Sequence, residues 1–200
     1  MRLKSLLNKF KLKELATQKL HWNFLPLWIV TTAFSYAIGG RVSAFVTDWI
    51  MGDLGVWLSF GLMSLAIAFS QWLVIRKYIV GFSWFWATLI GGTVGGSVSS
   101  WASFQLAITY GDALDLVVVY ACLRGLSVGV MQWIILKQYF RRSEWWIVVS
   151  TASWYGGVWV GWLLINKLGY FLTLTIGAIY GLLTGIALLL MFRNMIKIVD

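Results

Sequence analysis

The feature that most constrains this chain is a series of six apolar runs joined by short polar connections. A helix needs about 20 apolar residues to cross the hydrocarbon core of a bilayer. Only 12% of the 200 residues are charged, against roughly 25% in a soluble domain. We therefore expect an all-α polytopic membrane bundle of six transmembrane helices. The predicted spans are 25–47, 57–75, 84–110, 114–136, 145–165 and 172–192, with a short interfacial turn at 47–55 between the first two.

The segment before the first run has a different character. Residues 1–23 place leucines and Phe10 on one helical face and lysines elsewhere. That pattern predicts a basic amphipathic helix on the membrane surface, followed by a transmembrane domain at 24–200.

The charged loop residues predict an orientation for the bundle. The basic residues gather at the end that carries both termini, and the acidic residues Asp48, Asp53, Asp112 and Asp115 gather at the other end. The positive-inside rule then makes both termini cytoplasmic. The net charge of +9 follows from this distribution and does not indicate a nucleic-acid surface.

Two stretches of the chain have similar sequences, QWLVIRKY at 71–78 and QWIILKQY at 132–139. The similarity extends without a gap through the following helices, and a weaker copy precedes both. We interpret the chain as three parallel helical hairpins, at about 24–77, 78–138 and 139–195, related by a pseudo-threefold rotation about the membrane normal. The ungapped alignment pairs Gln71/Gln132, Trp72/Trp133, Tyr78/Tyr139, Trp84/Trp145, Gly95/Gly156 and Gly96/Gly157.

The repeated tryptophans and glycines have simple physical interpretations. Trp28, Trp84 and Trp145 begin their runs beside the basic flank, where an indole prefers the headgroup region. Glycines let helix backbones approach closely in a membrane. The glycines predicted to pack helices are Gly39, Gly40, Gly95, Gly96, Gly156 and Gly157.

The repeated glutamines, Gln71 and Gln132, precede the cytoplasmic basic residue of their helices by five positions. An amide at that depth is costly unless it bonds to a neighbouring helix. Interhelical packing is the interpretation we adopt. The alternative is that both glutamines line a shared pocket on the threefold axis.

Two arginines lie inside apolar runs and are candidate ligand-binding residues. Arg124 is roughly 13–20 Å from either end of its helix, near the bilayer centre. The repeat aligns it with Met63 and Tyr180, so the repeat does not require it. Arg41 lies in the outer half of the first run. Arg124, together with Arg41, either holds an anion, a lipid headgroup or another polar ligand in an interior cavity, or makes an internal structural bond to Asp48, Asp112, Asp115 or backbone carbonyls.

The residue types that catalysis needs are scarce in the runs. The single histidine, His21, lies outside them, no carboxylate lies mid-membrane, and there is no phosphate-binding loop or metal-spaced cluster. We therefore expect no enzymatic activity, no metal and no haem.

The Trp- and Gly-rich hairpins, with their Gln-Trp words, resemble small multi-span membrane proteins common in cyanobacteria. The resemblance would cover residues 28–193 and implies a bacterial inner or thylakoid membrane. It implies no activity. We expect an accessory or binding subunit that packs against membrane lipids or within a larger membrane complex. We also expect it to carry a bound lipid. A pigment held by Gln71, Gln132 or water is a minor variant of that role.

The alternative function is a solute-binding transport component or a small-anion carrier. Six runs in 200 residues resemble the substrate-binding subunits of energy-coupling-factor vitamin transporters, and Ala33 and Ala37 match a small-residue contact motif of that family. The threefold repeat and the 14 tryptophans depart from its pattern.

Overall fold

The computed structural model describes residues 23–79, 81–111, 116–164 and 169–199. The described part of the chain is all-helical, with six long helices and one short 3₁₀ turn, η2 (Gly169–Phe171). The predicted surface helix at 1–23 lies outside the described residues, apart from Asn23. The long helices are α2 (Phe24–Trp49), α3 (Gly52–Ile75), α4 (Ser83–Tyr110), α5 (Leu116–Leu136), α6 (Trp145–Leu163) and α8 (Leu172–Val199).

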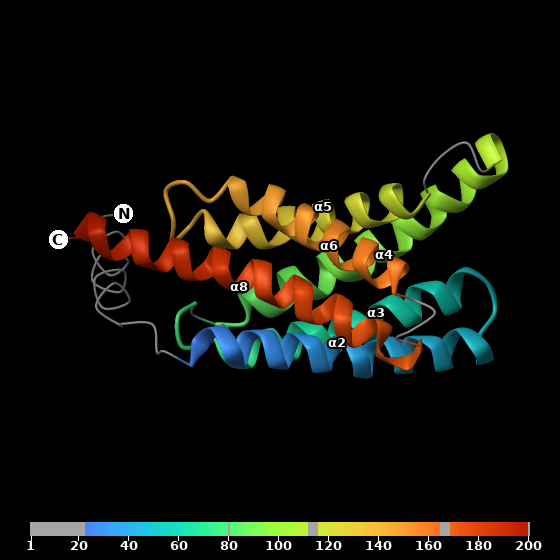
Figure 1. The fold of residues 1–200 in the computed structure, drawn as a ribbon, viewed down its shortest axis with the longest axis horizontal. Coiled ribbons are helices and arrows are strands. Elements are labelled where there is room, and N and C mark those ends of the chain that lie inside the picture. The colour runs from blue at the N-terminus through green and yellow to red at the C-terminus, as the bar shows by residue number, and fades with distance from the viewer. Residues whose placement is uncertain (1–22, 80, 112–115, 165–168, 200) are drawn as a thin grey trace.

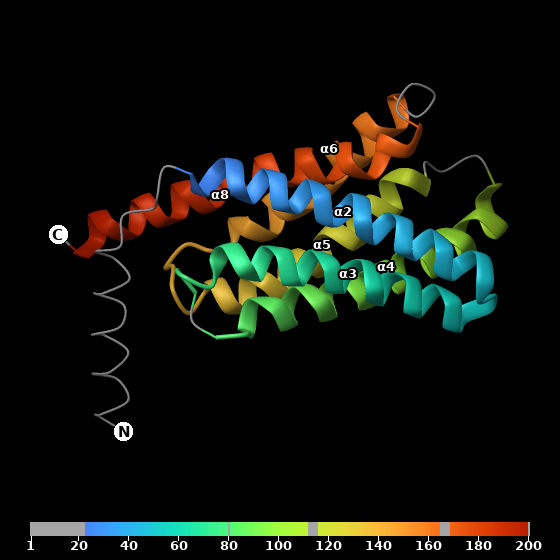
Figure 2. The ribbon, with the colours of Figure 1, turned by 90° about the horizontal axis from the view of Figure 1, so that it is seen from below.

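The six helices form a closed ring. Each helix packs against the next one along the chain, and α8 contacts both α6 and α2, which closes the circle. Figures 1 and 2 show consecutive helices running in opposite directions along the long axis of the molecule, with the α3–α4 and α5–α6 connections and the end of α8 at one end. Short connections make antiparallel neighbours, as in other helix bundles.

Four of the described helices are long and apolar enough to cross a membrane: α2, α3, α5 and the part of α8 up to Arg193. The remaining two, α4 and α6, are 28 and 19 residues long. Their many Gly, Ser and Trp residues lower the mean hydropathy. On their inner faces, α4 and α6 carry side chains that form hydrogen bonds to neighbouring helices, among them Trp84, Thr88 and Trp146.

The connection between α2 and α3 is tighter than the predicted interfacial turn at 47–55. Helix α2 continues to Trp49 and α3 already begins at Gly52, so only Ile50 and Met51 lie between them. Gly52 has φ +79°, a conformation that glycine adopts without steric cost. That freedom allows the chain to reverse within two residues.

The main hydrophobic core lies at the end of the ring that holds the α3–α4 and α5–α6 connections. Its centre is a row of three indoles with no exposed surface, Trp28, Trp84 and Trp146. Neighbouring rings in the row meet edge to face, with centroids 6.0 and 5.8 Å apart, an arrangement that aromatic quadrupoles favour.

This core corrects the headgroup interpretation of the repeated tryptophans. Trp28 and Trp84 are completely buried instead of facing a membrane interface, and Trp146, not Trp145, takes the third inner position. Trp145 is 36% exposed. The physical reason is that each inner indole finds a hydrogen-bond acceptor on an adjacent helix, which makes burial of its N–H favourable.

Candidate functional site

The three buried indoles each donate a hydrogen bond across a helix–helix contact. Trp84 Nε1 donates to Gln71 Oε1 at 3.3 Å, and Trp146 Nε1 donates to Gln132 Oε1 at 3.1 Å. Trp28 Nε1 donates to Thr184 Oγ1 at 3.1 Å. These bonds occupy alternate contacts around the ring: α3 with α4, α5 with α6, and α8 with α2.

The two glutamines also connect to each other. Gln132 Nε2 donates to Thr88 Oγ1 at 2.9 Å and lies 3.4 Å from Gln71 Oε1. Both amides are fully buried, with at most 1% of their surface exposed. Gln71 therefore accepts from two helices, while its own Nε2 has no partner among the described residues.

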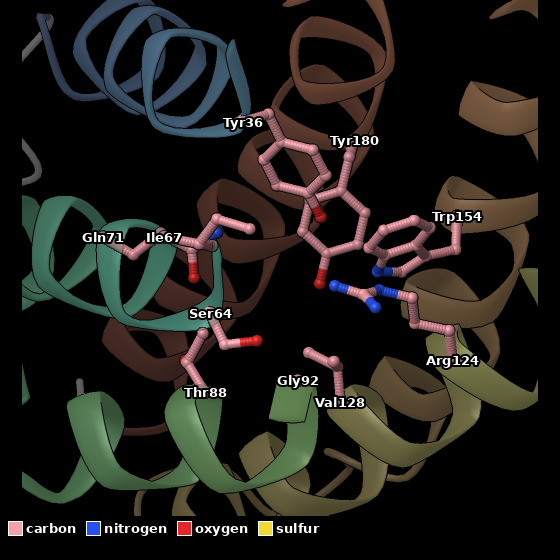
Figure 3. Close-up of a pocket in the computed structure, with 10 residues that line it drawn as sticks. All are labelled: Tyr36, Ser64, Ile67, Gln71, Thr88, Gly92, Arg124, Val128, Trp154 and Tyr180. Atoms are coloured by element: carbon pink, nitrogen blue, oxygen red, sulfur yellow. The ribbon is translucent and has the colours of Figure 1, made fainter. Parts of the chain in front are cut away.

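Gln71 borders a small cavity at the centre of the ring, to which every long helix contributes (Figure 3). Measured as the space open to the centre of a water molecule, its volume is about 10 Å³, close to the minimum that one water needs. The lining residues are Tyr36, Ser64, Ile67, Gln71, Thr88, Gly92, Arg124, Val128, Trp154 and Tyr180.

Arg124 supplies the charge of this cavity. Its side chain is 1% exposed, and its guanidinium carbon lies 4.6 Å from the ring centre of Phe60 and 4.7 Å from that of Trp154. Two further contacts are long, 3.4 Å from Nη1 to the Tyr120 hydroxyl and 3.6 Å from Nη2 to Met63 Sδ. Within the described chain, Arg124 has no carboxylate partner.

Several residues that line the cavity carry hydrogen-bond donors. Four of its polar groups have no partner in the described part of the chain: Ser64 Oγ, Gln71 Nε2, Arg124 Nε and Trp154 Nε1. Three of these four can only donate. In Figure 3 the guanidinium, the Ser64 hydroxyl and the Tyr180 hydroxyl point toward the central space. Such a surface suits an anion or a strongly accepting oxygen.

The predicted site residues do not all meet here. Arg124 and Gln71 line the cavity, and Gln132 lies behind Gln71. Arg41 is exposed on the last turns of α2 and is not among the lining residues. Asp48 is exposed as well, and Asp112 and Asp115 lie outside the described residues.

The glycines of the repeat differ in their surroundings. A Cβ added at Gly96 would collide with the Arg124 guanidinium and with the Phe60 ring, and one at Gly39 would lie 3.1 Å from the Met63 backbone. A Cβ at Gly40, Gly95 or Gly157 would also meet a neighbour on another helix. Gly156 is different, because an added Cβ would meet no atom within 4 Å. This glycine therefore makes no close helix contact.

Four lining residues carry no obvious signal in the sequence: Tyr36, Ser64, Trp154 and Tyr180. The repeat contains part of the missing information, because it aligns Arg124 with Met63 and Tyr180, and all three approach the ring centre. Met63 contacts the guanidinium, and Tyr180 lines the same cavity.

Comparison with known proteins adds nothing to these observations, since no family model, curated protein or solved structure matches the chain.

Proposed function

We propose that this protein is a non-enzymatic integral membrane protein in which all six long helices span the bilayer and both ends of the chain lie on the cytoplasmic side. The surface supports this proposal. Large apolar side chains such as Phe34, Leu65 and Val148 are exposed around the ring, whereas serine, threonine, glutamine and arginine are buried inside it. An outer surface of this kind is suited to lipid.

The pseudo-threefold arrangement of hairpins belongs to the same proposal. Its support is the tryptophan bond that recurs at every second helix contact around the ring. In two hairpins the acceptor is a glutamine, and in the third it is Thr184, one turn along α8 from the aligned Leu188. Thr184 thus provides the acceptor for the Trp28 indole, while Leu188, at the position of the glutamines, fills the apolar core.

The function that the geometry supports best is binding of a small anion at Arg124. The observation that carries it is a buried guanidinium, without a carboxylate partner in the described chain, beside a cavity whose free polar groups are mostly donors. A buried charge needs a counter-charge or dense hydrogen bonding. The aromatic faces of Phe60 and Trp154 attract the cation but leave its in-plane N–H groups available for an anion.

The size of the cavity restricts the class of anion. A volume of about 10 Å³ for water-sized centres leaves room for one monatomic ion at most, and a halide, which is larger than a water molecule, would need only small shifts of the lining side chains. Sulfate, phosphate or a carboxylic acid would require the helices to separate. We therefore propose chloride or a related halide, held in the interior of the ring.

The test is the anion dependence of thermal unfolding in detergent. A ligand that binds only the folded state raises stability by about 2.7 kcal/mol at one hundred times its Kd. We expect chloride and bromide, but not sulfate or gluconate, to raise the unfolding temperature of the wild type at constant ionic strength. Arg124→Met should abolish this shift. Methionine already occupies the aligned position 63, and the substitution removes a buried charge, so the variant is expected to fold.

A matched control separates binding from general salt effects. Arg76 also stacks on a tryptophan, with its guanidinium carbon 5.2 Å from the Trp72 ring centre, but it is exposed. Arg76→Met should therefore keep the full halide shift. An equal halide shift in Arg124→Met, or a wild type that responds equally to all anions, would show that no halide binds at Arg124.

The accessory role in a larger membrane complex remains a second candidate. The many exposed aromatic side chains on the outer surface, among them Trp86, Trp101 and Trp162, favour contacts with lipid or with other membrane helices. Gentle solubilisation followed by size analysis tests this role, because a complex would migrate well above the 22.7 kDa chain.

A further inference from the structure

A second pocket lies at the opposite end of the ring from the tryptophan core, between the first turns of α3 and the second half of α4. Its volume is about 550 Å³, within the range of small-molecule sites. The residues that line it are Asp53, Val56, Trp57, Ser97, Val98, Ser100, Trp101 and Phe104. None of them takes part in the Arg124 cavity.

The pocket combines aromatic faces with a carboxylate. Trp57, Trp101 and Phe104 are 45%, 64% and 63% exposed, so the pocket opens to the surroundings of the bundle. Asp53 stands at the second position of α3 and forms no ion pair with any described residue. Indole faces and a carboxylate together attract an ammonium group, and the same carboxylate repels an anionic headgroup.

The inner wall of the pocket is polar. Ser97 is only 4% exposed, and its hydroxyl has no partner among the described residues. That hydroxyl has almost no accessible surface, so the polar side chain that a ligand in the pocket can reach is the half-buried Ser100, which lines the same wall.

We propose that this pocket holds a membrane lipid with an ammonium headgroup. The ammonium lies against Asp53 and the indole faces, and the acyl chains run along the outer surface of α3 and α4. A lipid is favoured over a soluble amine because the pocket walls are exposed apolar side chains and Asp53 lies at the end of a membrane helix. This inference requires the bilayer insertion proposed above but is independent of the anion at Arg124.

The test is competition between two lipids for the full-length protein in detergent, followed by native mass spectrometry. Phosphatidylethanolamine and phosphatidylglycerol with identical acyl chains are added in equal amounts. We expect the wild type to retain the ethanolamine lipid about fivefold more, the effect of one partly desolvated charge contact. Asp53→Asn should lower this preference to about one.

Asp48→Asn is the matched control, because Asp48 is an exposed carboxylate at the same end of the ring outside the pocket. It should keep the wild-type preference. Equal retention of both lipids by the wild type, or an unchanged preference in Asp53→Asn, would overturn the proposal. Displacement of the lipid by equimolar free ethanolamine would assign the pocket to a soluble amine and overturn it too. A halide shift that persists in Asp53→Asn would show that the anion site stands regardless of this outcome.

Discussion

The indole of Trp28 donates its N–H to the hydroxyl of Thr184 across 156 positions of sequence, at 3.1 Å. This bond joins α2, the first described helix, to α8, the last one, and lies at the contact that closes the ring. The Thr184 hydroxyl in turn donates a hydrogen bond to the backbone carbonyl of Tyr180 at 2.6 Å. Tyr180, which lines the central cavity, is thus connected through Thr184 to the indole row of the core.

Thr184→Val should weaken the closure of the ring. The substitution preserves the shape of the side chain but leaves the Trp28 N–H buried without an acceptor, which costs about 1–3 kcal/mol. We expect a lower unfolding midpoint in detergent. Thr175→Val on the same helix is the control, because Thr175 bonds only to the Phe171 carbonyl at an exposed position, and it should leave the midpoint nearly unchanged. Equal midpoints for the two variants would contradict the role of this bond.

Gln132→Leu tests the amide network. Leucine occupies the aligned position 188, so the side chain is compatible with the helix, but the change removes the acceptor of Trp146 and the donor to Thr88. We expect a loss of about 1–3 kcal/mol in the free energy of unfolding. Gln138→Leu, at an exposed position of the following loop, should cost much less. If both changes cost the same, the buried network would contribute nothing specific.

Gly96→Ala should affect both stability and anion binding. A methyl group at this position would collide with the Arg124 guanidinium and the Phe60 ring, and a side chain of this size cannot be accommodated without displacing the cation. We expect a smaller halide-dependent shift of the unfolding temperature and lower overall stability. Gly156→Ala is the control, since its added methyl meets open space. A full halide shift in Gly96→Ala would show that the guanidinium position does not govern binding.

The two ends of the ring should lie on opposite sides of a membrane. In a Cys122→Ser background, Gln138→Cys marks the end with the basic loops and Asp48→Cys marks the acidic end. A membrane-impermeant maleimide applied to intact cells should label position 48 and leave position 138 unlabelled until the cells are opened, because basic loops remain cytoplasmic. Labelling of both positions from outside would rule out six crossings with this orientation.

The amide of Gln71 shows how far prediction from the sequence could reach. Its depth in the helix indicated a buried polar group that needed a partner. The two interpretations, interhelical bonding and a place in a pocket, both apply, because Gln71 bonds to a neighbouring helix and also borders the cavity. The tryptophans show where prediction failed. Trp145 and Trp146 are adjacent in the chain, and only the rotation of α6 about its axis decides which indole turns inward.

The sequence by itself determined the positions of the helices and the separation of basic from acidic ends, because apolar run length and charge are local properties. It also marked Arg124 as a charge that needs compensation. Only the tertiary structure decided what surrounds that charge. Phe60, Trp154, Tyr36 and Tyr180 come from four different helices, and their convergence depends on how each helix is rotated and packed within the closed ring. Residue spacing along one helix contains no record of that rotation relative to the others.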